Sequence, residues 1–352
     1  ACAPGPEAPA ACAPAPMVAA RWCLVVAAAA PALLAVIVPE IWIQRAVWRN
    51  RPKKGTQAAW PSRYVLNNVS NLPCPSFITS ERVEQLANGS FEHRSSDIWI
   101  VTYPKCGTTW TQAIVGSLLG FEIAGLSEAD QRVYCPWPER ALGGARLSIA
   151  ELNERPAPRC LKSHWTMSDH LSMPERGKVI FVMRNAADVA QSYFHHYLDL
   201  HRLFDFDGDW GDFFGLFEAG DLGSGNYFRY VASWWPQRNA SNVLFLRYEE
   251  MRQDPASHVQ RIAEFIGVGR LSEGRLEEVL EATSFARMRK VEEGQMRLKR
   301  LFGIRRDVRV RQGKSFEGQR MLSPAQRSIL EEQFNQTLRP LGVPRKWALG
   351  LD

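Results

Sequence analysis

The segment Asp97-Ile-Trp-Ile-Val-Thr-Tyr-Pro-Lys-Cys-Gly-Thr-Thr-Trp110 decides the fold of this chain. Its apolar run, residues 97–103, ends at a proline and predicts a buried strand, while apolar residues at helical spacing over 108–119 predict a helix. A strand that leads through a glycine-containing loop into a helix presents free backbone N–H groups at the positive end of the helix dipole. The segment therefore predicts a loop that binds phosphate.

Lys105 adds a point charge to this loop, and Thr108 and Thr109 add hydroxyl donors. The loop differs from the Walker pattern, in which the lysine follows the last glycine, because Lys105 precedes Gly107. An ordinary turn with an exposed Lys105 is the alternative that this loop alone leaves open.

Two more pairs of strand and helix follow the first. Residues 178–183 predict a strand before a helix from 186 toward 198, and residues 242–248 predict a strand before a helix over 255–266. Continuous apolar strands that alternate with helices favour a parallel sheet covered on both faces. We therefore expect an α/β fold of three layers, with a central, mainly parallel sheet, helices on both faces and a P-loop-like loop.

Composition limits the class of protein. The 352 residues are 45% hydrophobic and 23% charged, which excludes a disordered chain, a collagen and a protein with many membrane spans. The net charge of +6 suits an anionic ligand but is too diffuse to indicate nucleic acid, so we expect no nucleic-acid partner.

The cysteines indicate neither a disulfide framework nor a zinc site. They number seven, form no CxxC pair, and none follows Cys160. We therefore expect no disulfide bridge within the C-terminal half, as in a chain adapted to a reducing compartment, and no metal site.

The N-terminal part divides into two segments. Residues 1–16 are rich in Ala and Pro and are expected to be disordered. Residues 17–55 contain an uncharged run, 22–39, that would be about 27 Å long as a helix and could span a membrane. We expect a retained membrane anchor; a signal peptide and a transit peptide are the alternatives, and Pro31 weakens a helix.

The charges beside this run predict its orientation. Five cations follow it, whereas Arg21 alone stands close before it, so the positive-inside rule directs the C-terminal domain to the cytosol. Four Asn-x-Ser/Thr sequons are then expected to be unused. A soluble cytoplasmic protein is the alternative. The five cations are Arg45, Arg49, Arg51, Lys53 and Lys54.

Five segments together resemble the cytosolic sulfotransferases, which use 3′-phosphoadenosine 5′-phosphosulfate (PAPS). They are TYPKCGTTW at 102–110, LKSHW at 161–165, RNAADVAQSYFHHY at 184–197, FLRYEEM at 245–251 and TSFARM at 283–288. The resemblance extends over roughly residues 60–340, and we expect the catalytic domain at 60–345. It implies that the phosphate loop binds the phosphosulfate and that no metal takes part.

Sulfonate transfer requires a base for the acceptor and cations for the negative charge that spreads over the leaving group. His164 occupies the position of the family's base, and an imidazole can take the acceptor proton near neutral pH. The resemblance assigns Lys105 to the leaving oxygen and the sulfonate, and Lys162 to the same group. A core or surface histidine and a surface lysine are the alternatives. Ser192 is assigned to the 3′-phosphate, with a second role near Lys105.

The resemblance also assigns the cofactor-binding residues. Arg184, like Ser192, matches a 3′-phosphate ligand, and a strand that ends at Arg184 would deliver it to the sheet edge where ligands bind. The other assigned residues are Cys106, Gly107, Thr108 and Thr109 of the loop; Trp110, Tyr248, Thr283 and Phe285 around adenine; and Arg311, Gln312 and Gly313 near the 3′-phosphate. The four residues around adenine could instead be core.

The chain departs from the family pattern at three places. Gln312 replaces a usual lysine, so cofactor affinity is expected to be lower unless Lys314 compensates. Cys106 replaces a small residue, and we expect no nucleophilic role because direct transfer needs no covalent intermediate. The family's dimerisation motif is not matched, which leaves the oligomeric state open; its positions would be Gln319, Ser323, Pro324 and Ser328.

The sequence thus predicts an enzyme that transfers sulfonate to a hydroxyl or amine of a small, lipophilic acceptor. The acceptor pocket is expected in loops around 134–148 and 200–225. A catalytically silent nucleotide-binding protein and a nucleotide-dependent kinase are the alternatives. The sequence shows neither a Walker lysine nor an acidic magnesium site for a kinase.

Overall fold

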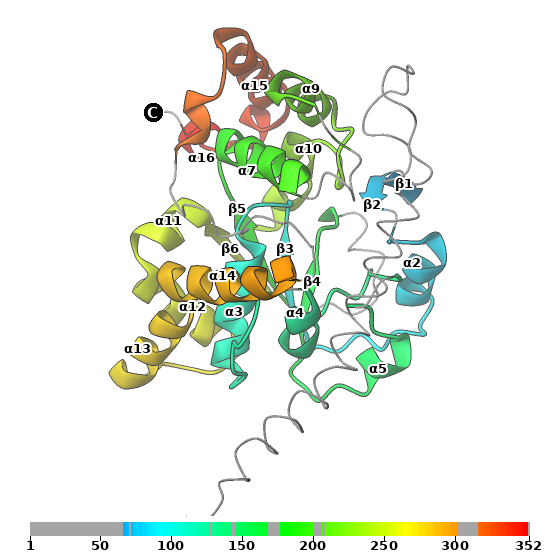
Figure 1. Ribbon diagram of the computed structural model, residues 1–352, viewed down its shortest axis with the longest axis vertical. Helices are drawn as coiled ribbons and strands as arrows, with labels where there is room; N and C mark the ends of the chain where they lie inside the picture. Colours follow the sequence, from blue (N-terminus) through cyan, green and yellow to red (C-terminus); the bar gives the residue numbers. More distant parts are fainter. Residues whose placement is uncertain are drawn as a thin grey trace, which may run out of the picture.

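Figure 1 shows the chain as a computed structural model. It describes residues 66–69, 72–75, 77–126, 128–142, 145–167, 177–199, 206, 208–301 and 316–350. The segments predicted at 1–16 and 17–55, with the membrane anchor, lie outside these ranges, as do Arg311, Gln312 and Gly313. Within the ranges, no helix combines the length and the apolar character needed to cross a membrane.

The centre of the domain is a parallel sheet of four strands in the order β4-β3-β5-β6. The strands are β3 (Ile98–Thr102), β4 (Cys160–Ser163), β5 (Lys178–Met183) and β6 (Val243–Arg247). Three of them were expected from the sequence, and the parallel sheet is confirmed. β4 was not assigned as a strand, because its four residues are too short for a periodic signal.

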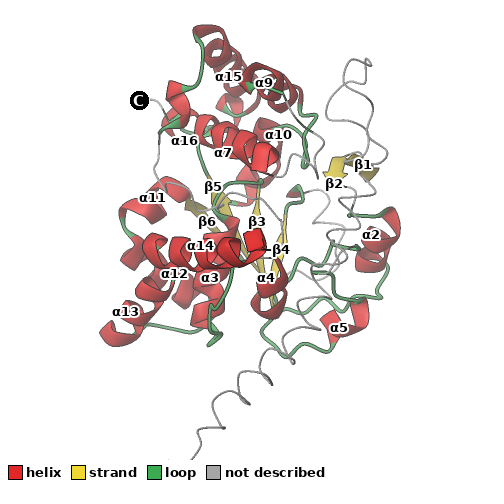
Figure 2. Cartoon of the chain, in the orientation of Figure 1, coloured by secondary structure: helices red, strands yellow, loops and turns green. Residues whose placement is uncertain are grey.

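Helices cover both faces of this sheet, as the predicted three layers require (Figures 1 and 2). Alternate residues of β3 supply the two cores: Trp99 and Val101 belong to one hydrophobic cluster, and Ile98 and Ile100 to the other. Helices α7 (Ala186–Asp199), α9 (Trp210–Ala219), α10 (Tyr227–Trp234), α15 (Pro324–Thr337) and α16 (Arg345–Leu349) contribute to the first cluster. Helices α3 (Thr108–Leu118), α12 (Pro255–Ile266), α13 (Glu273–Ala282) and α14 (Phe285–Leu301) contribute to the second.

Shorter elements connect these layers. A hairpin of β1 (Leu66–Val69) and β2 (Leu72–Pro75) is antiparallel and separate from the main sheet. Within the described ranges, the remaining helices are α2 (Ser80–Ala87), α4 (Glu128–Tyr134), α5 (Ile149–Asn153) and α11 (Tyr248–Gln253), and the 3-10 turns are η1 (Trp235–Gln237), η2 (Gly318–Arg320) and η3 (Arg339–Leu341).

A buried ion pair fixes the starts of β3 and β4 against each other. Arg159 and Asp97 are both fully buried, and Nε and Nη2 of the arginine each lie 2.7 Å from a carboxylate oxygen of Asp97. The backbone N–H of Ile98 also donates to the carbonyl of Arg159, over 2.8 Å. Loss of one partner would leave an uncompensated buried charge, at a cost of about 3–5 kcal/mol.

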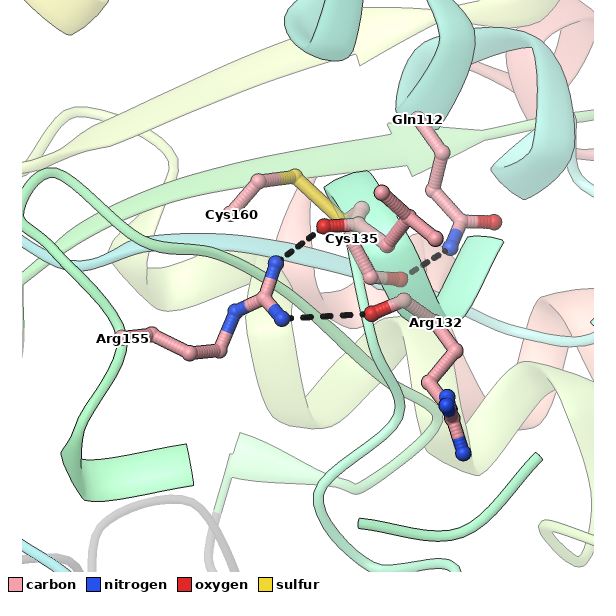
Figure 3. Close-up of a disulfide and its surroundings, with 6 residues drawn as sticks. Gln112, Arg132, Cys135, Arg155 and Cys160 are labelled. Carbon is pink, nitrogen blue, oxygen red and sulfur yellow. Dashed lines mark hydrogen bonds between the residues drawn. A yellow bond between two sulfur atoms is a disulfide. The ribbon is translucent and has the colours of Figure 1, made fainter. Parts of the chain in front are cut away.

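The described residues include one disulfide, although the sequence indicated no disulfide framework. Cys135, just after α4, and Cys160, the first residue of β4, form a disulfide with their Cα atoms 4.6 Å apart (Figure 3). Gln112 of α3 donates to the carbonyl of Cys135, and Arg155 donates to the carbonyls of Arg132 and Val133. The spacing of the cysteines in the sequence could not reveal this pair, because only the fold brings the end of α4 beside the edge strand β4.

The disulfide should contribute measurably to stability. Because it closes a loop between residues 25 apart, its removal should cost about 3 kcal/mol and lower the melting temperature by about 6–12 °C. We expect this loss in the double variant Cys135→Ser/Cys160→Ser, measured by calorimetry without reductant. The control is Cys74→Ala, which removes a buried thiol that takes no part in this disulfide. Equal melting of the double variant and the wild type would contradict the prediction.

Candidate active site

The loop between β3 and α3 has the backbone geometry of an anion site. Lys105 and Gly107 both have positive φ, 75° and 101°. Gly107 is the N-cap of α3 and has no side chain to cap that helix, so its first N–H groups can face an anion. A Cβ on Gly107 would lie 2.7 Å from Cδ2 of Tyr248, so glycine is required for both reasons.

The two threonines of the loop already have partners. The hydroxyl of Thr108 lies 2.6 Å from that of Thr102, and Thr109 accepts from Gln131 over 3.5 Å. Cys106 is buried, and burial raises the pKa of its thiol far above the usual range, although the nearby charge of Arg184 opposes this rise. A neutral thiol agrees with the expectation that Cys106 is not a nucleophile.

Strand β4 carries Lys162 and leads into His164. Nδ1 of His164 lies 2.7 Å from the carbonyl oxygen of Thr102. Because a carbonyl only accepts, Nδ1 carries the proton and the lone pair is on Nε2, the nitrogen that can act as a base. Nζ of Lys162 lies 4.1 Å from the ring centroid of Trp137, and the same ring contacts His164 edge-on at 5.1 Å.

Arg184 follows β5 at the same edge of the sheet. Its guanidinium donates to the carbonyl of Lys105 over 3.3 Å and lies 4.5 Å from the ring centroid of Tyr248. The carboxylate of Asp188, one turn along α7, is 3.5 Å away. Ser192 lies four residues beyond Asp188 and therefore on the same face of α7, where it is partly exposed.

Asp188 also holds a distant segment of the chain. The backbone N–H groups of Phe316 and Gly318 donate to its two oxygens over 2.7 and 2.8 Å. A Cβ on Gly318 would lie 2.2 Å from the carbonyl of Ala187, so this approach requires glycine. Phe316 and Gly318 thus both contact the carboxylate that lies beside Arg184.

Aromatic rings gather around Tyr248, which packs against Arg184. The rings of Trp110 and Tyr248 are 5.9 Å apart, and Nε1 of Trp110 donates to the carbonyl of Thr283 over 3.0 Å. The guanidinium of Arg252 lies 5.8 Å from the ring of Trp110 and 5.7 Å from that of Phe285. The four residues assigned to adenine therefore form one neighbourhood.

Several residues that surround the predicted site residues were missed by the sequence analysis. They are Trp137, Glu139, Asp188, Glu249 and Arg252. Glu249 is buried and accepts from the backbone and side chain of Asn185 over 2.9 and 2.7 Å. Asp188 and Glu249 lie inside quoted motifs, so a buried carboxylate in a motif was an available signal, whereas nothing in the sequence distinguishes Trp137 or Arg252.

One expectation on a flanking segment needs correction. The range 200–225, expected as an acceptor loop, contains helix α9 over 210–219, because Asp209 caps an apolar helical face. The positions of the absent dimerisation motif serve another purpose, since Ser323 caps α15 and Pro324 is its first residue.

Comparison with known proteins identifies relatives along most of the chain. A family profile described as "Sulfotransferase domain" matches residues 95–342. Sulfotransferase 1A1 of Bos taurus is 34% identical over 204 residues, which are 57% of this chain and 68% of that protein. Sulfotransferase 1A1 of Rattus norvegicus is 32% identical over 231 residues, 65% of this chain and 78% of that protein.

Solved structures share the fold. The crystal structure of mouse sulfotransferase SULT7A1 complexed with PAP aligns with a TM-score of 0.61 and 24% identity, over 78% of this chain and 95% of that one. Retinol dehydratase in complex with androsterone and the inactive cofactor PAP aligns with the same TM-score and identity, over 76% and 87%.

Substitution of Gly107 should test whether the loop between β3 and α3 binds an anion. In Gly107→Ala, a strained φ and the contact with Tyr248 should weaken binding of adenosine 3′,5′-bisphosphate about 10-fold or more, measured by calorimetry. Gly120→Ala is the matched control, since Gly120 has φ +86° and no atom within 4 Å of an added Cβ. Equal affinity of the two variants would contradict the assignment of the loop.

Proposed function

Because the chain belongs to the sulfotransferase family and is a PAPS-dependent transferase, we propose that it moves the sulfonate of PAPS in line to a hydroxyl of a small, lipophilic acceptor. An amine acceptor is compatible with the same chemistry. The observation that carries the proposal is the convergence of Lys105, the Lys162–His164 pair and Arg184 at the carboxyl edge of one parallel sheet.

The cations of the site suit a sulfonate in transfer. In such a transfer, negative charge spreads over the moving group and the leaving phosphate, and fixed positive charge stabilises it. The uncapped start of α3 and Lys105 supply this charge from one strand, and Lys162 supplies it from the next. Ser192 is assigned by resemblance to the same region. These residues fit the phosphosulfate that the chemistry requires.

His164 is the proposed general base. The bond from Nδ1 to the carbonyl of Thr102 orients the ring and holds the tautomer that leaves Nε2 basic. Nε2 would remove the proton of the acceptor hydroxyl as the new O–S bond forms and the bond to the leaving phosphate breaks. The imidazolium formed keeps its contact with Thr102, because Nδ1 stays protonated throughout.

The nucleotide end of the donor is assigned to Arg184 and the aromatic residues. A guanidinium presents a fork of donors that matches a phosphate, and this one lies 3.5 Å from the carboxylate of Asp188 and 4.5 Å from the ring centroid of Tyr248. The rings of Trp110 and Phe285 offer apolar faces to adenine. The hydrogen bond from Trp110 to the carbonyl of Thr283 holds the first of these rings in place. Arg311, Gln312 and Gly313 are proposed to complete the 3′-phosphate site.

The acceptor is proposed to be lipophilic because an aromatic ring lies beside the base. Trp137 contacts His164 edge-on and belongs to the loop 134–148, where the acceptor was expected. Retinol dehydratase has been crystallised with androsterone and with retinol, each together with PAP. A phenol, sterol or long-chain alcohol is the corresponding class for this chain.

We also propose that the domain faces the cytosol, from the charges beside the apolar run. The disulfide between Cys135 and Cys160 opposes this proposal, since such bonds are rare in reducing compartments.

The nucleotide that the protein binds most tightly distinguishes a sulfotransferase from a kinase. Two separated phosphate sites should bind adenosine 3′,5′-bisphosphate far more tightly than ATP with Mg²⁺, as measured by calorimetry. Labelled PAPS with a panel of phenols, sterols and aliphatic alcohols should yield sulfonated product. Tighter binding of ATP would favour the kinase, and bisphosphate binding without transfer to any acceptor would favour a silent binding protein.

Removal of the base should affect turnover without affecting the cofactor. His164→Ala should lower kcat about 10²- to 10⁴-fold, because the acceptor proton loses its base, and should leave bisphosphate affinity within about 2-fold. His258→Ala is the matched control, because the Nδ1 atom of His258 has the same kind of contact, 2.8 Å from the carbonyl of Asp254, on helix α12. Unchanged kcat in His164→Ala would move the base to another residue.

A further inference from the structure

Glu139 is a buried carboxyl group to which the proposed function gives no role. It lies in the loop between α4 and α5, and no part of it is exposed. One oxygen, Oε1, accepts from the hydroxyl of Ser163 over 2.5 Å. The other, Oε2, is buried and has no hydrogen-bond partner in the part of the chain that the structure describes. A buried carboxyl group with only one hydrogen-bonded oxygen lowers the stability of the fold, so its presence here calls for a functional reason.

The charges around Glu139 come from the catalytic strand and from α2. Burial raises the pKa of Glu139 to about 7, while the bond from Ser163 and the charges of Lys162 and Arg82 act against this rise. Arg82 is itself held by the carbonyls of Leu147 and Arg140. Glu139 is therefore close enough to feel the charges of both Arg82 and Lys162, the lysine proposed to contact the sulfonate.

Ser163 connects this carboxyl to the backbone on both sides of His164. Its hydroxyl donates to Glu139 and accepts from the backbone N–H of Trp165 over 3.2 Å. The serine stands between Lys162 and His164 in sequence. The chain of Glu139, Ser163 and Trp165 thus braces the short segment that carries both groups.

The loop that carries Glu139 is attached along the free edge of β4. The backbone N–H of Lys162 donates to the carbonyl of Pro136 over 2.9 Å, and the disulfide joins Cys135 to Cys160. Trp137 of the same loop contacts Lys162 and His164. These attachments give Glu139 a fixed position from which to orient Ser163.

We propose that Glu139 is a positioning residue for sulfonate transfer, which acts through the hydroxyl of Ser163 to hold Lys162 and His164 in register. The inference rests on the proposed function and adds to it a residue that touches neither donor nor acceptor. It requires an acceptor oxygen at position 139, because the Ser163 hydroxyl must have a partner. Misplacement of reacting groups by about 1 Å can cost about 100-fold in rate.

The test compares two ways of changing Glu139. Glu139→Leu removes the acceptor oxygen, so kcat with PAPS should fall about 10- to 100-fold, with bisphosphate affinity within about 2-fold. Glu139→Gln keeps an oxygen for Ser163 and should retain kcat within about 3-fold. Ser163→Ala should reproduce the loss of Glu139→Leu, and the double variant should lose no more than either single one.

Gln112→Leu is the matched control, because it tests whether a general loosening of the loop that carries Glu139 is enough to lower kcat. It removes the buried bond to the carbonyl of Cys135 but leaves Glu139 and Ser163 intact, so it should lower the melting temperature and leave kcat unchanged. Wild-type kcat in both Ser163→Ala and Glu139→Leu would overturn the proposal. If Glu139→Leu does not fold, wild-type kcat in Ser163→Ala is sufficient to overturn it. A wild-type protein that transfers no sulfonate would instead contradict the proposed function.

Discussion

Parallel pairing of four short strands is the constraint on which the site depends. Ile98 pairs with Cys160 of β4 and with Lys178 of β5, and Val179 pairs with Val243 of β6. With the starts of the strands aligned in this way, their ends meet at one edge. Four parts of the site therefore come together although they are far apart in the sequence. They are the loop after β3, His164 after β4, Arg184 after β5 and Tyr248 after β6.

Backbone shape matters at this edge as much as side-chain chemistry. The turn into α3 needs two residues of positive φ, and one of them, Lys105, is not glycine. Such a conformation costs about 1–2 kcal/mol in a non-glycine residue, so the surrounding structure must impose it. Tyr248 packs where a side chain on Gly107 would lie, and Arg184 binds the carbonyl of Lys105. The strand ends thus hold the phosphate loop in shape.

Buried carboxylates support the cations of the site from behind. Asp188 contacts Arg184, Glu249 holds the backbone of Asn185, and Glu139 reaches the strand of Lys162. Each accepts hydrogen bonds from backbone or hydroxyl groups of a neighbouring element. Such fixed bonds orient a cation before the donor arrives, and preorganised charge of this kind needs no rearrangement during the reaction.

The sequence by itself determined the α/β class, the strands predicted over 97–103, 178–183 and 242–248, and the glycine-containing loop that leads from the first of them into a helix. These features depend on local patterns: apolar runs, helix spacing and a glycine that must adopt positive φ. Only the tertiary structure decided β4, the disulfide of Cys135 and Cys160, the helix α9, and the contacts that Asp188 and Glu139 make. Each of these depends on contacts between residues far apart in the chain, such as Ser163 with Glu139 or Asp188 with Gly318, and a local pattern carries no record of which distant groups the fold will bring together.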